Sequence, residues 1–226
     1  MKLINYLRLK LNLNKKEVIK YFNKKDIFVN NERCQNFDIE LKELDVISYE
    51  NKSYIYKEHI YLMLNKPKGY ICSKVDEAYP SLLKIVPDEF QRADLDIVGR
   101  LDQDTEGLIF LSTDGIFLHK ITSPKKKITK TYYVEHLNPL KEIDISNGIT
   151  FKDYQTDKIA LKKLTPSSSL ITITDGKYHE VKKIIQYLDS KVTYLKRIEI
   201  GTISLGDLAT GGIKELTKEE VDSLIN

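Results

Sequence analysis

The segment from residue 98 to residue 111 constrains this chain most. It places Arg100 and Asp102 in a polar loop that leads directly into the apolar run 108–111. A short run of this composition, preceded by a glycine, predicts a buried β-strand. A carboxylate in a loop that the core holds in this way would be poised for chemistry.

This loop also has two simpler interpretations. Asp102, Asp104 and Glu106 precede a glycine as in a calcium-binding loop, but the twelfth position of that loop requires a glutamate and is Thr113 here. The residues after the glycine also predict a strand and not an exiting helix, so the pattern does not favour calcium. The second interpretation is a surface ion pair between Arg100 and Asp102, which would contribute little to stability. The segment by itself leaves this second interpretation open.

Length and composition set the broad class. A chain of 226 residues with 41% hydrophobic residues is long enough for one or two soluble domains. No apolar run approaches a membrane span, and the N-terminus lacks a signal-peptide core, so we expect a cytoplasmic protein with no membrane contact. Cys34, Cys72 and the four histidines show no pairing or ligand spacing, so we expect no disulfide and no metal. The net charge of +3 decides nothing by itself, because the clustering of the lysines matters more.

The N-terminal residues predict two helices. The first is expected over residues 3–10, and Asn14 followed by Glu17 is the capping-box signature of a second helix start. On the second helix Val18 and Phe22 share one face. The opposite face carries lysines spaced four residues apart, namely Lys16, Lys20 and Lys24.

A small sheet should follow these helices. Residues 26–29 and 44–49 predict strands, and Asn30-Asn31 predicts a tight turn that tolerates positive φ. Residues 51–59 are polar with interleaved tyrosines, which we interpret as a linker. The pattern resembles the alpha-L (S4-like) RNA-binding domain, in which a basic helix lies against RNA phosphates. It departs from that family at Asn31, where glycine is usual, and in having lysine in place of several arginines, and a solvated helix face remains an equal alternative.

The remaining chain carries three further motifs. A strand over residues 60–65 leads into the turn Lys66-Pro67-Lys68-Gly69, and a second short strand is expected over 70–72. Lys130-Thr131-Tyr132 opens another strand, on whose hydrophobic face Tyr132 would be an ordinary residue. Residues 175–188 predict a turn and a helix that buries Val181, Ile184, Ile185 and Leu188.

The phase of that last helix separates its two lysines. Lys182 lies at the border of the apolar face, whereas Lys183 points away from it, towards water. Only Lys182 is therefore placed to reach a partly buried carboxylate. Further on, Thr217 with Glu220 predicts the capped start of a final helix.

Taken together and in this order, the motifs resemble those of the pseudouridine synthases that modify ribosomal RNA. The matching patterns are Asn-Lys-Pro-x-Gly, Gly-Arg-Leu-Asp, Lys-x-Tyr, and Gly-x-x-His-x-Val followed by a basic residue. With the S4-like segment they cover nearly the whole chain. The resemblance implies an α+β fold with an S4-like RNA-binding domain and linker over residues 1–56. A catalytic domain over residues 57–226 would follow, with a mixed, mainly antiparallel sheet and flanking helices.

The resemblance also implies roles for individual residues. Asp102 would be the catalytic residue of a reaction that needs no cofactor and no metal, acting either as nucleophile or as base. Lys182, a lysine where the family has arginine, would keep Asp102 ionised. Arg100 would fill the gap left by the flipped uridine, and Tyr132 would stack on the target uracil. The expected RNA-binding residues are Lys16, Lys20, Lys24, Lys66 and Lys130.

The expected substrate is a uridine in bacterial ribosomal RNA, bound by a monomer. The lack of long extensions most resembles the type that modifies 16S RNA, in free form or in the assembling small subunit, although relatives that act on 23S RNA share these motifs. Two other functions compete with this one. A catalytically silent ribosome-assembly factor would have no need of Asp102, and a nucleotide hydrolase would need a phosphate-binding glycine loop or metal ligands, which we do not find.

Overall fold

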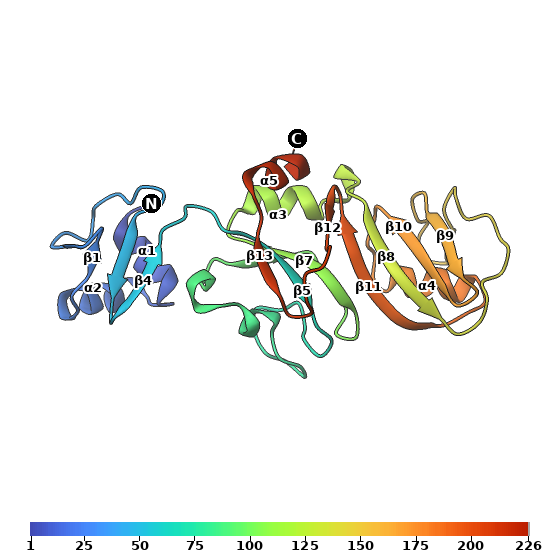
Figure 1. Ribbon diagram of the computed structural model, residues 1–226, viewed down its shortest axis with the longest axis horizontal. Helices are drawn as coiled ribbons and strands as arrows, with labels where there is room; N and C mark the ends of the chain where they lie inside the picture. The colour runs from blue at the N-terminus through green and yellow to red at the C-terminus, as the bar shows by residue number, and fades with distance from the viewer. Residues whose placement is uncertain (226) are drawn as a thin grey trace. The chain divides into compact units, whose positions relative to one another are not determined.

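The computed structural model describes residues 1–225 and divides the chain into two compact units (Figure 1). The first unit comprises Met1–Ile60 together with Ile85–Asp96, and the second comprises Tyr61–Lys84 and the residues from Ile97 onward. The sequence-based division after residue 56 had assigned residues 85–96 to the second domain. No helix within residues 1–225 has the length and hydrophobicity that a membrane crossing requires.

Two helices open the first unit as predicted. They are α1 (Leu3–Lys10) and α2 (Lys15–Lys24). The capping box is present, because the Asn14 side chain accepts hydrogen bonds from the amides of Lys16 and Glu17, and the Glu17 carboxylate accepts one from the Asn14 amide. Val18 and Phe22 are buried, while Lys16, Lys20 and Lys24 are exposed.

A four-stranded sheet in the order β2-β1-β3-β4 completes this unit. Its strands are β1 (Phe28–Val29), β2 (Glu32–Arg33), β3 (Val46–Tyr49) and β4 (Lys52–Ile55). Asn30 and Asn31 form the β1–β2 turn with φ of 52° and 68°, as predicted. The interpretation of residues 51–59 as a linker was wrong over β4, in which Tyr54 is buried. Tyr56, directly after the strand, is buried too, and exposed Ile55 lies between them.

Specific contacts tie residues 85–96 to this unit. The Tyr54 hydroxyl donates to the Asp88 carboxylate at 2.7 Å. The Arg92 guanidinium, whose side chain is 3% exposed, pairs with Asp94 and donates to the Lys57 carbonyl at 2.8 Å. Tyr54 and Asp88, like Lys57 and Arg92, lie more than thirty residues apart in sequence. No local pattern could therefore have assigned the segment.

The second unit is built on a nine-stranded sheet with the order β13-β5-β7-β11-β8-β10-β9. Strands β12 and β6 pair with β11 and β7 beside this path. The β7–β11 pairing is parallel and the other pairings along the path are antiparallel, so the sheet is mixed, as predicted. The strands are β5 (Tyr61–Lys66), β6 (Asp96–Val98), β7 (Glu106–Ser112), β8 (Lys130–His136), β9 (Ala160–Thr165), β10 (Ser168–Ile173), β11 (Val192–Ile200), β12 (Ile203–Ser204) and β13 (Ile213–Glu215).

Helices α3 (Gly115–Thr122), α4 (Glu180–Tyr187) and α5 (Lys218–Ile225) accompany this sheet. All four predicted core residues of α4 are buried, and Thr217 and Glu220 form the predicted cap of α5. The short strand expected over residues 70–72 is wrong, because only Ile71 forms a bridge there, with Ser81. Short 3-10 helices span Leu82–Ile85, Asp88–Phe90 and Pro124–Lys126.

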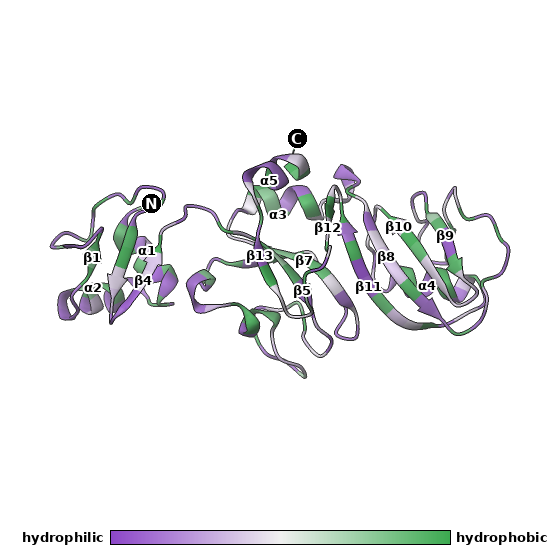
Figure 2. Ribbon diagram, in the orientation of Figure 1, coloured by the Kyte–Doolittle hydropathy of each residue, from purple (hydrophilic) through white to green (hydrophobic). Residues whose placement is uncertain are grey.

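The centre of the sheet is its most hydrophobic part. Strands β5 and β7 carry mostly hydrophobic residues (Figure 2), and residues 108–111 of β7 are fully buried. Gly107 lies where β7 meets β11, with φ of +109°. A Cβ atom at this position would lie 2.2 Å from the Arg197 carbonyl oxygen. Only glycine therefore permits the parallel pairing that follows the 102–105 loop.

We expect Gly107→Ala to lower the free energy of unfolding of the second unit by more than about 2 kcal/mol, because it adds a backbone clash to an unfavourable φ. Gly69→Ala is the matched control, since Gly69 has φ of +90° but open space around its Cβ position. The control should cost only ~1 kcal/mol. Urea unfolding of both variants measures the difference, and equal losses would contradict the role given to the close approach.

Candidate active site

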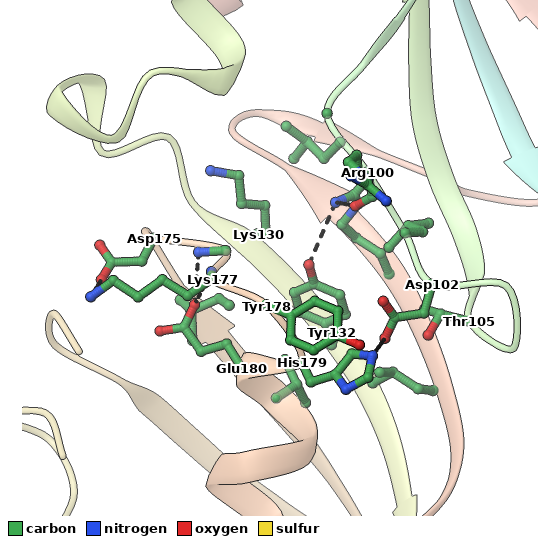
Figure 3. Close-up of a pocket in the computed structure, with 18 of the residues that line it drawn as sticks. Arg100, Asp102, Thr105, Lys130, Tyr132, Asp175, Lys177, Tyr178, His179 and Glu180 are labelled. Carbon is green, nitrogen blue, oxygen red and sulfur yellow. Dashed lines mark hydrogen bonds and ion pairs between the residues drawn. The ribbon is translucent and has the colours of Figure 1, made fainter. Parts of the chain in front are cut away.

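A cavity of about 360 Å³ opens in the second unit. It is lined by the loop before β7, the first residues of β8, the loop that leads into α4, and β11 (Figure 3). Three of the sequence motifs converge here, because Arg100, Asp102, Tyr132 and Lys182 all line it. The Lys-Pro-x-Gly turn contributes no lining residue.

Asp102 is held by two side chains from the α4 region. Its Oδ2 atom lies 3.0 Å from Lys182 Nζ and 3.3 Å from His179 Nε2. The predicted contact between Lys182 and Asp102 is thus present. His179 was not singled out from the sequence, although it is part of the Gly-x-x-His motif. Both contacts fall on the same carboxylate oxygen.

Lys182 is shared with a second carboxylate. Its Nζ atom lies 2.7 Å from Oδ1 of Asp104 and donates hydrogen bonds to both oxygens of that group. Partial burial acts to lower the pKa of Lys182, but the hydrogen bonds and charges of Asp104 and Asp102 outweigh it and the pKa is raised. Burial likewise acts to raise the pKa of Asp104, and Lys182 reverses this so that the pKa is lowered. The ammonium therefore stays charged between two carboxylates.

Lys66 holds the 102–105 loop from within the protein. Its side chain is fully buried, and Nζ donates to the carbonyls of Thr105 at 2.9 Å, Pro67 at 3.1 Å and Gln103 at 3.4 Å. Burial lowers the pKa of this lysine. The expectation that Lys66 binds RNA was wrong, because β5 directs the ammonium under the loop and away from solvent.

Tyr132 and Arg197 form the inner wall of the cavity. Tyr132 is 6% exposed, and its hydroxyl lies 3.5 Å from Nη1 of Arg197. Arg197 is buried and donates through Nε to the Leu108 carbonyl at 2.7 Å and through Nη1 to the Arg100 carbonyl at 3.4 Å. It thereby ties β11 to β7 and to the loop of Asp102. Residues two apart on a strand share one face. The spacing of Arg197 from Leu195 was therefore the one sequence signal that it points to the buried face.

Lys130 lines the same cavity, but its ammonium is not free. Nζ donates to the carbonyls of Ile128 at 2.8 Å and Thr174 at 3.0 Å. Burial and the nearby charge of Arg197 lower its pKa to about 8. Lys130 was expected to bind RNA, and its half-buried position in the cavity wall brings it close to whatever the cavity holds.

The lysine that follows Lys182 does not lie where the helical projection placed it. Lys183 was expected to point to water, but it is half-buried and its ammonium lies over the Tyr154 ring, 5.1 Å from the ring centre. The long segment before β9 supplies this ring, which a helical projection of α4 could not reveal. Arg100 is exposed at the cavity rim, as expected for a side chain that meets a large substrate.

Comparison with known proteins gives this geometry its context. Residues 60–201 match the family model for RNA pseudouridylate synthase, and this range contains every residue that lines the cavity. The chain belongs to the RNA pseudouridylate synthase family. It is an RNA pseudouridine synthase, and thus an isomerase.

Similar proteins extend the likeness beyond the matched range. An uncharacterized RNA pseudouridine synthase of Aquifex aeolicus is 32% identical over 99% of this chain and 96% of its own length. The ribosomal small subunit pseudouridine synthase A of Haemophilus influenzae is 32% identical over the full length of both chains. The Escherichia coli protein of the same name is 37% identical over 73% of this chain and 74% of its own. The crystal structure of a pseudouridylate synthase with 30% identity matches 99% of both chains with a TM-score of 0.70.

The shared cation predicts how stability depends on pH. Because the pKa of Asp104 is lowered on folding, its ionised form stabilises the folded chain above its ordinary pKa of 3.8, and this contribution is lost as the pH falls through the lowered value. We expect Asp104→Asn to cost less than ~1 kcal/mol near neutral pH, because the side chain is 61% exposed. Thermal unfolding from pH 7 to pH 2 should show this deficit closing at acid pH. A deficit that grows on acidification would contradict the assignment.

Proposed function

We propose that this enzyme converts a uridine of small-subunit (16S) ribosomal RNA to pseudouridine, with Asp102 as its catalytic residue. The observation that carries the proposal is the arrangement of the Asp102 carboxylate. Lys182 and His179 both contact Oδ2, and within residues 1–225 Oδ1 has no hydrogen-bond or ion-pair partner. A carboxylate fixed by one oxygen presents the other to a substrate in the cavity.

The reaction needs no group beyond those of the protein and the RNA. The bond between the sugar carbon C1′ and N1 of uracil breaks, the base turns, and C1′ bonds to C5. The proton on C5 is lost and N1 gains one, so atoms and charge balance. Asp102 Oδ1 serves by bonding to the sugar or by removing a sugar proton, and in both routes Lys182 holds the carboxylate in place through Oδ2.

The other residues at the cavity take supporting roles in this proposal. A uridine must leave its stack before its glycosidic bond can be reached, and exposed Arg100 at the rim is placed to occupy the vacated space. Tyr132 lines the cavity and orients the uracil ring. Arg197 and Lys130 place two positive charges behind it, which suits a base that carries negative charge once detached.

The small-subunit substrate is supported by the relatives named ribosomal small subunit pseudouridine synthase A, one of which matches this chain over its full length. An S4-like role for the first unit, in which α2 binds RNA phosphates, is supported by the exposed lysines on α2. Such a substrate, as free RNA or in an assembling subunit, lies in the bacterial cytoplasm. One copy of the chain carries the complete set of site residues, which favours action as a monomer.

The first test of this proposal is Asp102→Asn, which keeps the side-chain volume and removes the charge. We expect pseudouridine formation in 16S RNA to fall by at least ~100-fold while RNA affinity stays within about threefold. Asp104→Asn is the control, because Asp104 lies on the same cation but does not line the cavity, and it should keep most of the activity. Chemical tagging of pseudouridine after single turnover measures both variants.

Three results would contradict different parts of this proposal. Equal losses in the two variants would mean that the acid is wrongly assigned. Full activity of Asp102→Asn would refute the mechanism. Wild-type turnover on 23S RNA alone would leave the mechanism intact and refute the small-subunit substrate.

The lysine face of α2 gives a second test. Replacing Lys16, Lys20 and Lys24 by Gln should weaken RNA binding and reduce the slope of log affinity against log salt by roughly one for each lost phosphate contact. Replacing the same three by Arg should keep the slope, since charge and length are retained. Fluorescence titrations between low and moderate salt measure it. An unchanged slope in the Gln variant would show that this face is merely solvated.

A further inference from the structure

One aromatic ring at the cavity rim has no partner on its outer side. Tyr178 is 74% exposed, although it lines the same cavity as Asp102. Its ring stacks on the His179 ring with centres 3.8 Å apart and an angle of 21° between planes. A ring with one face covered can be this exposed only if its other face is open. The protein therefore presents a flat aromatic surface beside its catalytic carboxylate.

The loop that carries this ring is well fixed. The Glu180 carboxylate is buried and accepts hydrogen bonds from the amides of Gly176 and Lys177, both at 2.8 Å. His179 has φ of +53° and contacts Asp102 through Nε2, which fixes the second ring of the stack. Figure 3 shows Tyr178 and His179 together, with the His179 ring turned towards Asp102. Tyr178 is thus held in place before any substrate binds.

The charges around the ring favour a nucleic acid strand over a protein partner. Lys177 directly precedes Tyr178 in the chain, and both Lys177 and Lys183 lie over the Tyr154 ring, at 4.4 Å and 5.1 Å from its centre. Lys177 also pairs with Asp175 at 3.1 Å, whereas Lys183 makes no ion pair within residues 1–225. Lys183 begins close to the stack, because its amide donates to the His179 carbonyl at 2.9 Å. An exposed aromatic face with lysines close to it in the chain suits single-stranded RNA, in which bases stack and phosphates meet lysine.

We propose that Tyr178 is the stacking site for a nucleobase directly adjacent to the target uridine, with the connecting phosphate near Lys183. This rests on the proposed function, because it requires that the uridine be drawn into the cavity. Flipping removes the stacking partner of each neighbouring base. The Tyr178 ring replaces that partner, and the resulting stack of base, Tyr178 and His179 ends at Asp102. Recognition of the neighbouring base thereby holds the strand in register with the carboxylate.

The test is a double-mutant cycle between Tyr178 and the RNA. Tyr178→Leu should raise the enzyme concentration needed for half-maximal single-turnover rate by about 5- to 150-fold, the range expected for one base–aromatic stack. Tyr178→Phe should stay within about twofold. Removing one adjacent base, on the 5′ or the 3′ side, should cost the wild type a similar factor and Tyr178→Leu almost nothing. Tyr187→Leu is the matched control, an exposed tyrosine of α4 that does not line the cavity.

A second measurement covers a variant that is too slow to assay. A 2-aminopurine base next to the target should stay quenched on binding wild type or Tyr178→Phe, because an aromatic ring replaces its lost stacking partner, and should gain fluorescence on binding Tyr178→Leu. The proposal is overturned if, on the 5′ side and on the 3′ side alike, removal of the adjacent base costs wild type and Tyr178→Leu equally. It is also overturned if only removal of the target base itself couples to Tyr178. The cycle can be run on whichever RNA the wild type modifies, so a wrong 16S assignment would be recognised separately.

Discussion

One ammonium group between two carboxylates organises this active site. Lys182, on α4, contacts both Asp102 and Asp104, and so joins a helix to a loop almost eighty residues earlier in the chain. Below the same loop, buried Lys66 binds the carbonyls of Gln103 and Thr105. The loop is therefore held from two sides, by one lysine through its side chains and by another through its backbone. The position of Asp102 depends on both, and the parallel β7–β11 pairing allowed by Gly107 carries the loop to them.

The same arrangement decides which atoms are left for chemistry. Two groups contact Oδ2 of Asp102, so the mechanism proposed above takes Oδ1 as the reactive oxygen. Arg197 and Lys130 line the other wall of the cavity, where both are at least partly buried. Burial strengthens the electrostatic interaction between their charges and a nearby ligand. A negatively charged acid at the mouth and positive charge behind fit a reaction in which a sugar is attacked and its base departs with negative charge.

Several of these features could be predicted from sequence because they depend on local periodicity or spacing. The capping box of Asn14 and Glu17, the buried run of β7 and the phase that places Lys182 towards Asp102 are of this kind. The rest depends on contacts with distant segments. Lys66 looked like an exposed turn residue until β5 placed it inside. Strand β4 was missed because the polar Lys52 and Ser53 precede its one buried residue, Tyr54, and Lys183 lies over Tyr154 from another loop. The sharing of Lys182 with Asp104 likewise appears only once helix and loop are brought together.

The claim that the shared Lys182 ammonium controls Asp102 is tested most directly by the single-turnover rate of Lys182 variants across pH. Lys182→Met keeps the length and removes the charge, and we expect the rate to fall at least ~10-fold at each pH, because Asp102 loses the cation that holds it in place. Lys182→Arg should retain most activity, and Lys183→Met should leave the rate at saturating RNA unchanged. A Lys182→Met enzyme that turns over as fast as wild type at every pH would show that the shared cation does not control Asp102, and would contradict the account.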